Sequence, residues 1–252
     1  MGIEVTREGA VGIVRFVRPE KLNALTLAMY DDLGRAFAEF GRDDAINAIL
    51  LAGSGDRAFC VGADLTESIP ALASGQFDIS AWDPAHLKVA GFYKPVVSAV
   101  RGLCMGGGFE IMLATDLRIA AEDAVFQFPE VDHGFVPAGG TLVRLVRQIA
   151  YAHAMELLLS GRRFSAAELL ARGVVNQVVP ADRVEPVALE LATSIAAKNP
   201  VAVQTIKEAV VTLYDLPLAD AYAREATLGQ RAFTSDRARD GLSRFAARTV
   251  RD

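Results

Sequence analysis

The stretch GLCMGGGFE, residues 102–110, carries the strongest structural signal in this chain. It follows a β-branched run at Val96–Val100 and leads into an apolar stretch that ends at about Ala114. Three consecutive glycines between a buried strand and a helix let the backbone come close to another group, with free N–H groups at the helix N-terminus directed towards it. Taken alone, the glycines fit a tight strand–helix turn at least as well as a ligand site. They match neither a GxGxxG dinucleotide loop nor a phosphate-binding P-loop.

Strands and helices alternate on both sides of this stretch. Thr26 is a good N-cap for an amphipathic helix that runs to about Phe40. Residues 69–83 predict an irregular excursion of the kind that shapes a substrate pocket. The alternation predicts an α/β fold with a stacked parallel sheet. Runs typical of strands lie at 3–5, 11–17, 45–51, 96–100, 117–121 and 124–128.

From Gly139 onwards the sequence is mainly helical. Asp182 is the predicted cap of a helix that ends near Ala197, and Pro200 suits the first turn of the next helix. Several helices carry apolar residues on more than one face, which indicates burial against a second surface. The other predicted elements are helices at 141–149, 152–159, 166–171, 217–232 and 236–247 and a strand at 174–179.

The composition indicates a globular protein without a metal site or a disulfide framework. Hydrophobic residues make up 52% of the 252 positions, which is enough for a sizeable core. The net charge of −5 makes nucleic acid an unexpected partner. Cys60 and Cys104 are predicted to be buried, since no CxxC pair or Cys/His cluster accompanies them. With no signal-peptide pattern and no apolar run of roughly 20 residues, a cytoplasmic protein without a membrane span is expected.

Two glutamates are the candidate acid–base groups. Glu110 falls in the first turn of the helix after the glycines, among apolar neighbours, where a carboxylate is costly unless it is paired or functional. Glu130 lies one strand-containing loop later, so the chain can bring both carboxyls to one pocket. Two such acids can share a water for proton transfer. A glutamate that complements the helix dipole, or one in a loop salt bridge, explains each residue alone equally well.

A second candidate donor lies in the segment AFCVGADL, residues 58–65. Gly62 permits an unusual backbone angle, which lets the N–H of Ala63 point at a ligand. An ordinary loop is the simpler explanation of this segment by itself. His86, His133 and His153 are scattered without metal-ligand spacing and are predicted to be structural.

Four segments, in the same order, resemble signatures of the crotonase superfamily, also called the enoyl-CoA hydratase/isomerase family. They are RPEKLNAL at 18–25, AFCVGADL at 58–65, residues 102–116, and FPE at 128–130 with GFVPAGGT at 134–141. The resemblance covers nearly the whole chain. It implies a crotonase-like spiral of stacked ββα units, residues 1–195, with the CoA and acyl sites, and a C-terminal helical trimerisation region, residues 196–252. The expected assembly is a homotrimer or a dimer of trimers.

The resemblance also implies roles for particular residues. The backbone N–H groups of Ala63 and Gly107 match the oxyanion-hole positions that polarise a thioester carbonyl. Glu110 and Glu130 match the two acid–base positions of the family's hydratases, which add water syn across the 2,3 double bond of an enoyl-CoA thioester. Coenzyme A is then part of the substrate, and no separate cofactor is expected. Contacts with CoA or substrate are implied for Lys21, Ala24, Gly62, Asp64, Leu65 and Gly106.

Other functions are compatible with the same motifs. They include isomerisation, dehydration of a hydroxyacyl- or carnitinyl-CoA, decarboxylation, C–C hydrolysis and a non-catalytic, RNA-binding role. The glutamate pair favours hydration, because the family's isomerases typically keep one glutamate. Val61 and Asp132-His133 depart from the family pattern, and the C-terminus lacks the usual basic ending, for which Arg248 or Arg251 would have to substitute.

Overall fold

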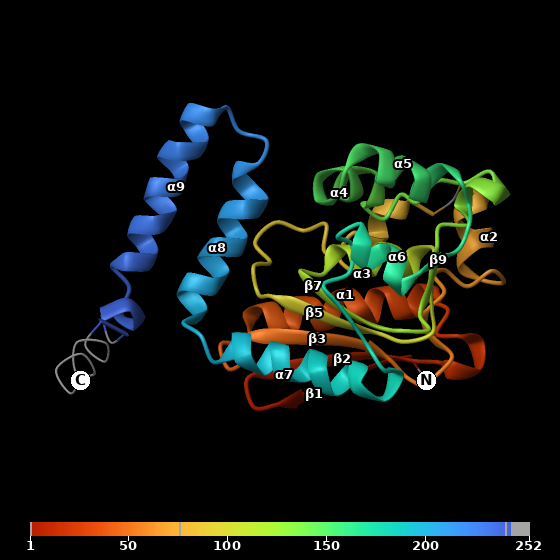
Figure 1. Ribbon diagram of the computed structural model, residues 1–252, viewed down its shortest axis with the longest axis horizontal. Helices are drawn as coiled ribbons and strands as arrows, with labels where there is room; N and C mark the ends of the chain where they lie inside the picture. The colour runs from red at the N-terminus through yellow and green to blue at the C-terminus, as the bar shows by residue number, and fades with distance from the viewer. Residues whose placement is uncertain (1, 76, 240, 243–252) are drawn as a thin grey trace.

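The larger of two sheets runs through the base of the molecule (Figure 1). The computed structural model describes residues 2–75, 77–239 and 241–242. Within this part β1 and β2 form an antiparallel hairpin, and every other pair of neighbouring strands in the sheet is parallel. Side chains of β3 and β5 are buried almost throughout, as in parallel sheets that are covered on both faces. The strand order is β1 (Gly2–Glu8), β2 (Val11–Val17), β3 (Ala48–Gly53), β5 (Val96–Val100), β7 (Leu117–Ala121) and β10 (Gln177–Val179).

The smaller sheet is built from the strands that directly follow those of the larger one. β3, β5 and β7 are followed by β4, β6 and β8, which pair with one another in parallel. The chain therefore winds as a spiral that adds one strand to each sheet per turn, and this confirms the predicted crotonase-like α/β architecture. The strands of the smaller sheet are β4 (Ala58–Cys60), β6 (Leu103–Met105), β8 (Val125–Gln127) and the antiparallel β9 (Phe164–Ser165).

Two long helices pack on the larger sheet. In α1 (Leu27–Arg42) the Thr26 hydroxyl accepts a hydrogen bond from the N–H of Met29 at 3.2 Å, which confirms the predicted N-cap. The helix α7 (Val184–Ala196) buries Val184, Ala188, Ala192 and Ala196, a stripe of small residues at a spacing of four that suits close approach to the strands. In Figure 1, α7 lies in front of the sheet and α1 behind it.

Three sequence-based element assignments are wrong. Asp182 does not cap α7: it lies inside a 3-10 turn, Ala181–Arg183, whose own backbone bonds join it to Pro180, and α7 begins only at Val184. The predicted irregular excursion contains a short helix, α2 (Ser68–Ala73), and a 3-10 turn, η2 (Ile79–Trp82). The predicted strand at 174–179 pairs only over Gln177–Val179, because the residues before it form the turn out of α6.

The later helices lie outside the two sheets. α3 (Gly107–Ala114), α4 (Thr141–Gln148), α5 (Tyr151–Leu159) and α6 (Ala166–Ala171) pack around the smaller sheet, whereas α8 (Pro200–Leu213) and α9 (Leu218–Phe233) form a hairpin that stands apart (Figure 1). The ammonium group of Lys207 ties α8 to the core through Asp116, at 2.7 Å, and the carbonyl of Lys94, at 2.9 Å. Half of the helix predicted at 236–247 lies outside the described residues; 236–239 and 241–242 are helical. No helix in the described part combines the length and the apolar composition needed to cross a bilayer.

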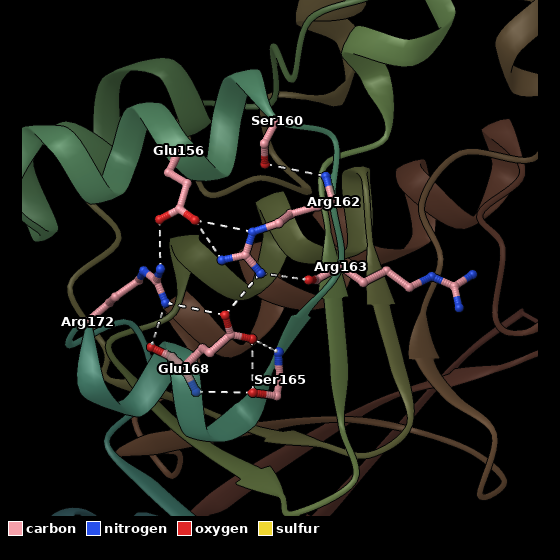
Figure 2. A network of polar contacts seen from close by, with 7 residues as sticks. All are labelled: Glu156, Ser160, Arg162, Arg163, Ser165, Glu168 and Arg172. Atoms are coloured by element: carbon pink, nitrogen blue, oxygen red, sulfur yellow. Dashed lines mark hydrogen bonds and ion pairs between the residues drawn. The ribbon is translucent and has the colours of Figure 1, made fainter.

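A network of charged side chains joins α5, β9 and α6 (Figure 2). The Arg162 guanidinium contacts Glu156 at 2.6 Å and Glu168 at 2.9 Å, and Arg172 contacts Glu156 at 2.7 Å. The Arg162 guanidinium also lies 3.6 Å from the ring centroid of the buried Phe164. The network therefore covers an aromatic side chain where β9 meets the smaller sheet.

Candidate active site

A cavity of about 800 Å³ lies beside the smaller sheet. Its wall comes from α1, the loop after β4, α2, η2, the start of α3 and the segment after β8. This volume falls within the range of small-molecule sites. Of the predicted site residues, the cavity is lined by Ala63, Leu65, Gly106, Gly107, Glu110 and Glu130. Four other predicted site residues are not part of the lining: Lys21, Ala24, Gly62 and Asp64.

Two glycines bring the candidate backbone donors together. β4 and β6 pair in parallel, with Cys60 opposite Cys104, so the loops that follow them leave the sheet side by side. Gly62 has a φ of +92°, and a Cβ at this position would lie 2.7 Å from the Gly107 nitrogen. Conversely, a Cβ on Gly107 would lie 3.7 Å from the Ala63 nitrogen. The close approach therefore depends on the missing side chain of Gly62.

The N–H groups of Ala63 and Gly107 are free to bind a ligand. Neither donates a hydrogen bond to an acceptor in the described part of the chain. Gly107 opens α3, where the first N–H groups have no partner within the helix and the helix dipole favours negative charge. Two free donors side by side suit an oxygen that gains negative charge during a reaction.

Glu110 is buried in the first turn of α3. Its Oε2 accepts hydrogen bonds from the N–H of Gly139 at 2.6 Å and from the hydroxyl of Thr141 at 2.9 Å. Burial, and secondarily the charge of Glu130, raise the pKa of Glu110 to about 7. The Gly139 N–H and the Thr141 hydroxyl hold Oε2 in place.

Glu130 opens the 3-10 turn η3 (Glu130–His133), directly after β8 and its following loop. Its Oε1 lies 3.0 Å from the position that a Cβ on Gly106 would occupy, and its buried Oε2 has no hydrogen-bond partner in the described residues. Burial raises the pKa of Glu130 to about 7. Both carboxyls therefore border one cavity and both exchange a proton near neutral pH, which is the condition for acid–base catalysis at that pH.

Three aromatic side chains form a wall that the sequence did not reveal as part of the site. Tyr30 and Trp82 stack with their ring centroids 4.0 Å apart, and the His86 ring lies 5.7 Å from that of Tyr30. His86 Nδ1 donates to the carbonyl of Trp82 at 2.9 Å, and burial lowers the pKa of His86 to about 4, so the imidazole is neutral. The prediction that His86 is structural missed its place in the cavity wall. The predicted pocket-shaping excursion, which contains Trp82, was the available signal.

Asp64 and Lys21, which do not line the cavity, have different surroundings. Asp64 is buried, and hydrogen bonds from Thr66 and from Arg18, the latter at 2.5 Å, lower the pKa of its carboxyl. The Asp64 carboxylate is therefore engaged in hydrogen bonds within the protein, whereas the Asp64 backbone adjoins Leu65 at the cavity mouth. Lys21 is exposed at the surface on the turn before α1.

The residues that depart from the family pattern differ in whether they face the cavity. Val61 and His133 line the cavity. Asp132 is directed elsewhere, because its carboxylate oxygens lie 2.7 Å from the position that a Cβ on Gly161 would occupy. Among the described residues there is no group of three or more His, Cys, Asp or Glu side chains placed to share a metal ion.

The spiral of paired strands and the cavity with its two backbone donors define a crotonase-type protein. The family model described as "Enoyl-CoA hydratase/isomerase" matches residues 6–250, so the chain belongs to this family, within the crotonase superfamily. It is 36% identical to an enoyl-CoA hydratase of Mycobacterium tuberculosis, over 96% of this chain and 92% of the relative. It is 33% identical to the mitochondrial enoyl-CoA hydratase of Pongo abelii, over 95% and 82%. The crystal structure of an enoyl-CoA hydratase from Bacillus anthracis superposes with a TM-score of 0.91 at 30% identity, covering 98% and 97%.

Proposed function

We propose that this protein is an enoyl-CoA hydratase, a hydro-lyase that adds water syn across the 2,3 double bond of a 2-enoyl-CoA thioester. The observation that carries this proposal is the pair of glutamates at one cavity, the buried Glu110 and the half-buried Glu130, both with a pKa of about 7, beside the free N–H groups of Ala63 and Gly107. The names of the relatives point to the same reaction.

The proposed reaction uses the two kinds of group together. The N–H groups of Ala63 and Gly107 bind the thioester oxygen and stabilise the negative charge that it gains as the β-carbon is attacked. An ionised glutamate takes a proton from water as the water oxygen bonds to the β-carbon, and a protonated glutamate gives its proton to the α-carbon. One proton is taken and one is given, so the pair ends with the same total charge. Because the two carboxyls are neighbours, the water oxygen and the proton reach the double bond from the same face.

Coenzyme A enters as part of the substrate, and the reaction needs no further cofactor. We place the CoA moiety at the cavity mouth, against the backbone of Asp64 and the exposed Leu65. The exposed ammonium of Lys21 suits a phosphate of the nucleotide. Ala24 supports this loop, since it precedes Leu25, whose N–H and carbonyl bond to Gly62 and Asp64. Nucleic acid is not an expected partner, and the cytoplasm stays the predicted location.

A homotrimer, or a dimer of such trimers, is the proposed assembly. In the single chain α8 and its C-cap residue expose an apolar stripe at a spacing of four, formed by Ile206, Val210 and the C-cap Tyr214. α9 adds Leu218 and Tyr222 to the exposed apolar surface of the hairpin. Exposed apolar surface of this kind is typical of subunit contacts.

The test follows the absorbance of the conjugated thioester of crotonyl-CoA in the presence of purified protein. Wild type is expected to remove the signal and to form 3-hydroxybutyryl-CoA. Glu110→Gln and Glu130→Gln keep the shape of each side chain and should each lower kcat by about 10²-fold or more. If a folded protein that binds CoA thioesters hydrates neither crotonyl-CoA nor longer 2-enoyl-CoA thioesters, the hydratase proposal is wrong. Product analysis with a 3-enoyl-CoA thioester would then identify an isomerase.

A further inference from the structure

The hydroxyl group of Tyr30 lies beside the two backbone donors. A Cβ on Gly107 would be 2.7 Å from this hydroxyl oxygen and 3.7 Å from the Ala63 nitrogen, so both border the same small space. Tyr30 also lines the cavity. The phenol thus reaches, from α1, the place where the loops after β4 and β6 meet.

The ring of Tyr30 is held firmly in this place. It is 2% exposed and stacks on Trp82 with an angle of 8° between the ring planes, while His86 flanks it. The hydroxyl donates to no other side chain or carbonyl within the described part of the chain, although nearly all of the residue is buried. Since the hydroxyl oxygen has no acceptor in this part of the protein and is not shut off from the cavity that Tyr30 lines, a ligand there can accept its hydrogen bond.

The phenol is a neutral donor at physiological pH. Burial raises the pKa of Tyr30 well above its usual value, and the charges of Cys60, Glu110 and Glu130 raise it further. These three titratable groups act on the hydroxyl from the end of β4, from α3 and from η3. A neutral hydroxyl next to an oxygen that gains negative charge forms a hydrogen bond that strengthens as the charge develops.

We propose that the Tyr30 hydroxyl is a third hydrogen-bond donor to the thioester oxygen, next to the N–H groups of Ala63 and Gly107. The proposal rests on the proposed function, because it needs a thioester in the cavity. It assigns a catalytic role to a residue that lies outside the four sequence motifs, on a helix face that serves otherwise as core. It also gives Gly107 a second reason to lack a side chain, because a Cβ there would displace the hydroxyl.

Tyr30→Phe tests the proposal, since it removes one oxygen and keeps the ring that stacks on Trp82. With a 2-enoyl-CoA substrate we expect kcat to fall by about tenfold or more while KM changes little. A second readout is the absorption band of bound 4-dimethylaminocinnamoyl-CoA, which moves to longer wavelength as the thioester carbonyl becomes polarised. The shift should be smaller in Tyr30→Phe than in wild type. Replacement of Tyr30 by 3-fluorotyrosine, a stronger donor of the same shape, should enlarge it.

Tyr151→Phe is the matched control, because Tyr151 is 70% exposed on α5, away from the cavity. It should leave kcat and the band position as in wild type. An unchanged band in Tyr30→Phe would overturn the proposal, even if kcat fell, because the hydroxyl would then not act on the carbonyl. If wild type hydrates no enoyl-CoA, the proposed function fails on its own, while the band of the bound thioester still decides the role of Tyr30.

Discussion

The two cavity glutamates are poised to hold different protonation states at neutral pH. With both pKa values at about 7, the form with one protonated and one ionised carboxyl is most populated near that pH. We therefore expect kcat to peak near neutrality and to fall by about tenfold per pH unit on the far side of each pKa. Initial rates measured across this range in buffers of constant ionic strength test the prediction. A rate that rises steadily to alkaline pH would contradict it.

The same titration affects stability. The folded protein keeps its proton on Glu110 up to about pH 7, whereas an unfolded glutamic acid loses it near 4.5. The folded state therefore binds more protons than the unfolded state between these values, and the free energy of unfolding falls as pH rises through them, by up to about 3 kcal/mol for this residue. Glu110→Gln should show a smaller loss in melting temperature between about pH 5 and about pH 8. Parallel profiles for the two proteins would show that Glu110 titrates normally.

Gly62 offers a backbone test of the same site. An alanine there would adopt a φ of +92° and place its Cβ 2.7 Å from the Gly107 nitrogen. We expect Gly62→Ala to lower kcat by about 10²-fold, because the two N–H groups would separate. Gly173→Ala is the matched control: φ is +76° but the surrounding space is open. It should cost about 1–2 kcal/mol in stability and leave kcat unchanged.

For single residues, the sequence predicted which groups take part in the reaction better than it predicted what surrounds each side chain. Motif matches singled out Glu110, Glu130, Ala63 and Gly107, and the structure brings all four to one cavity. For Tyr30 the sequence predicted only the amphipathic helix that carries it, because periodicity separates buried from exposed positions and says nothing about what a buried group faces.

Among the elements, the network around Phe164 stabilises the link between α5 and α6 (Figure 2). Glu156→Gln removes a charge that pairs with both Arg162 and Arg172. We expect a small fall in melting temperature at low salt, and a smaller one at high salt, because Glu156 and Arg162 are partly exposed to solvent. Thermal unfolding at two ionic strengths measures this, with Glu20→Gln, an exposed glutamate on another turn, as the control. Equal effects at both salt concentrations would show that the loss is not electrostatic.

Element boundaries were predictable where a local signal marks them. Thr26 caps α1 and Pro200 opens α8 through contacts within a few residues, so both were visible in the sequence. Asp182 carries the same local signal as Thr26 and still does not cap a helix, because the chain leaves β10 through a 3-10 turn first. The helix α2 has no cap hydrogen bond from a side chain and only six residues, which leaves too little pattern to predict it.

At the scale of the whole molecule, the exposed apolar face of α8 predicts a contact between subunits. One substitution in this face should weaken the assembly. Val210 is 69% exposed in the middle of the apolar stripe. Val210→Glu would bury a charge if that stripe is a subunit contact, so the trimer should dissociate in sedimentation analysis. Val5→Glu, an exposed valine changed on β1, is the control and should keep the trimer. A wild-type monomer would contradict the proposed assembly.

The spiral places the reacting groups and much of the wall of the acyl pocket on different segments of the chain. Ala63, Glu110 and Glu130 follow successive strands of the smaller sheet, whereas α2 and η2 contribute much of the remaining cavity wall from a single excursion between β4 and β5. Substitutions or length changes in that excursion can therefore reshape the acyl pocket while the paired strands keep the reacting groups in register. For enzyme engineering, exchanging α2 (Ser68–Ala73) between relatives should change the accepted acyl chain while Trp82, which stacks on Tyr30, stays in place.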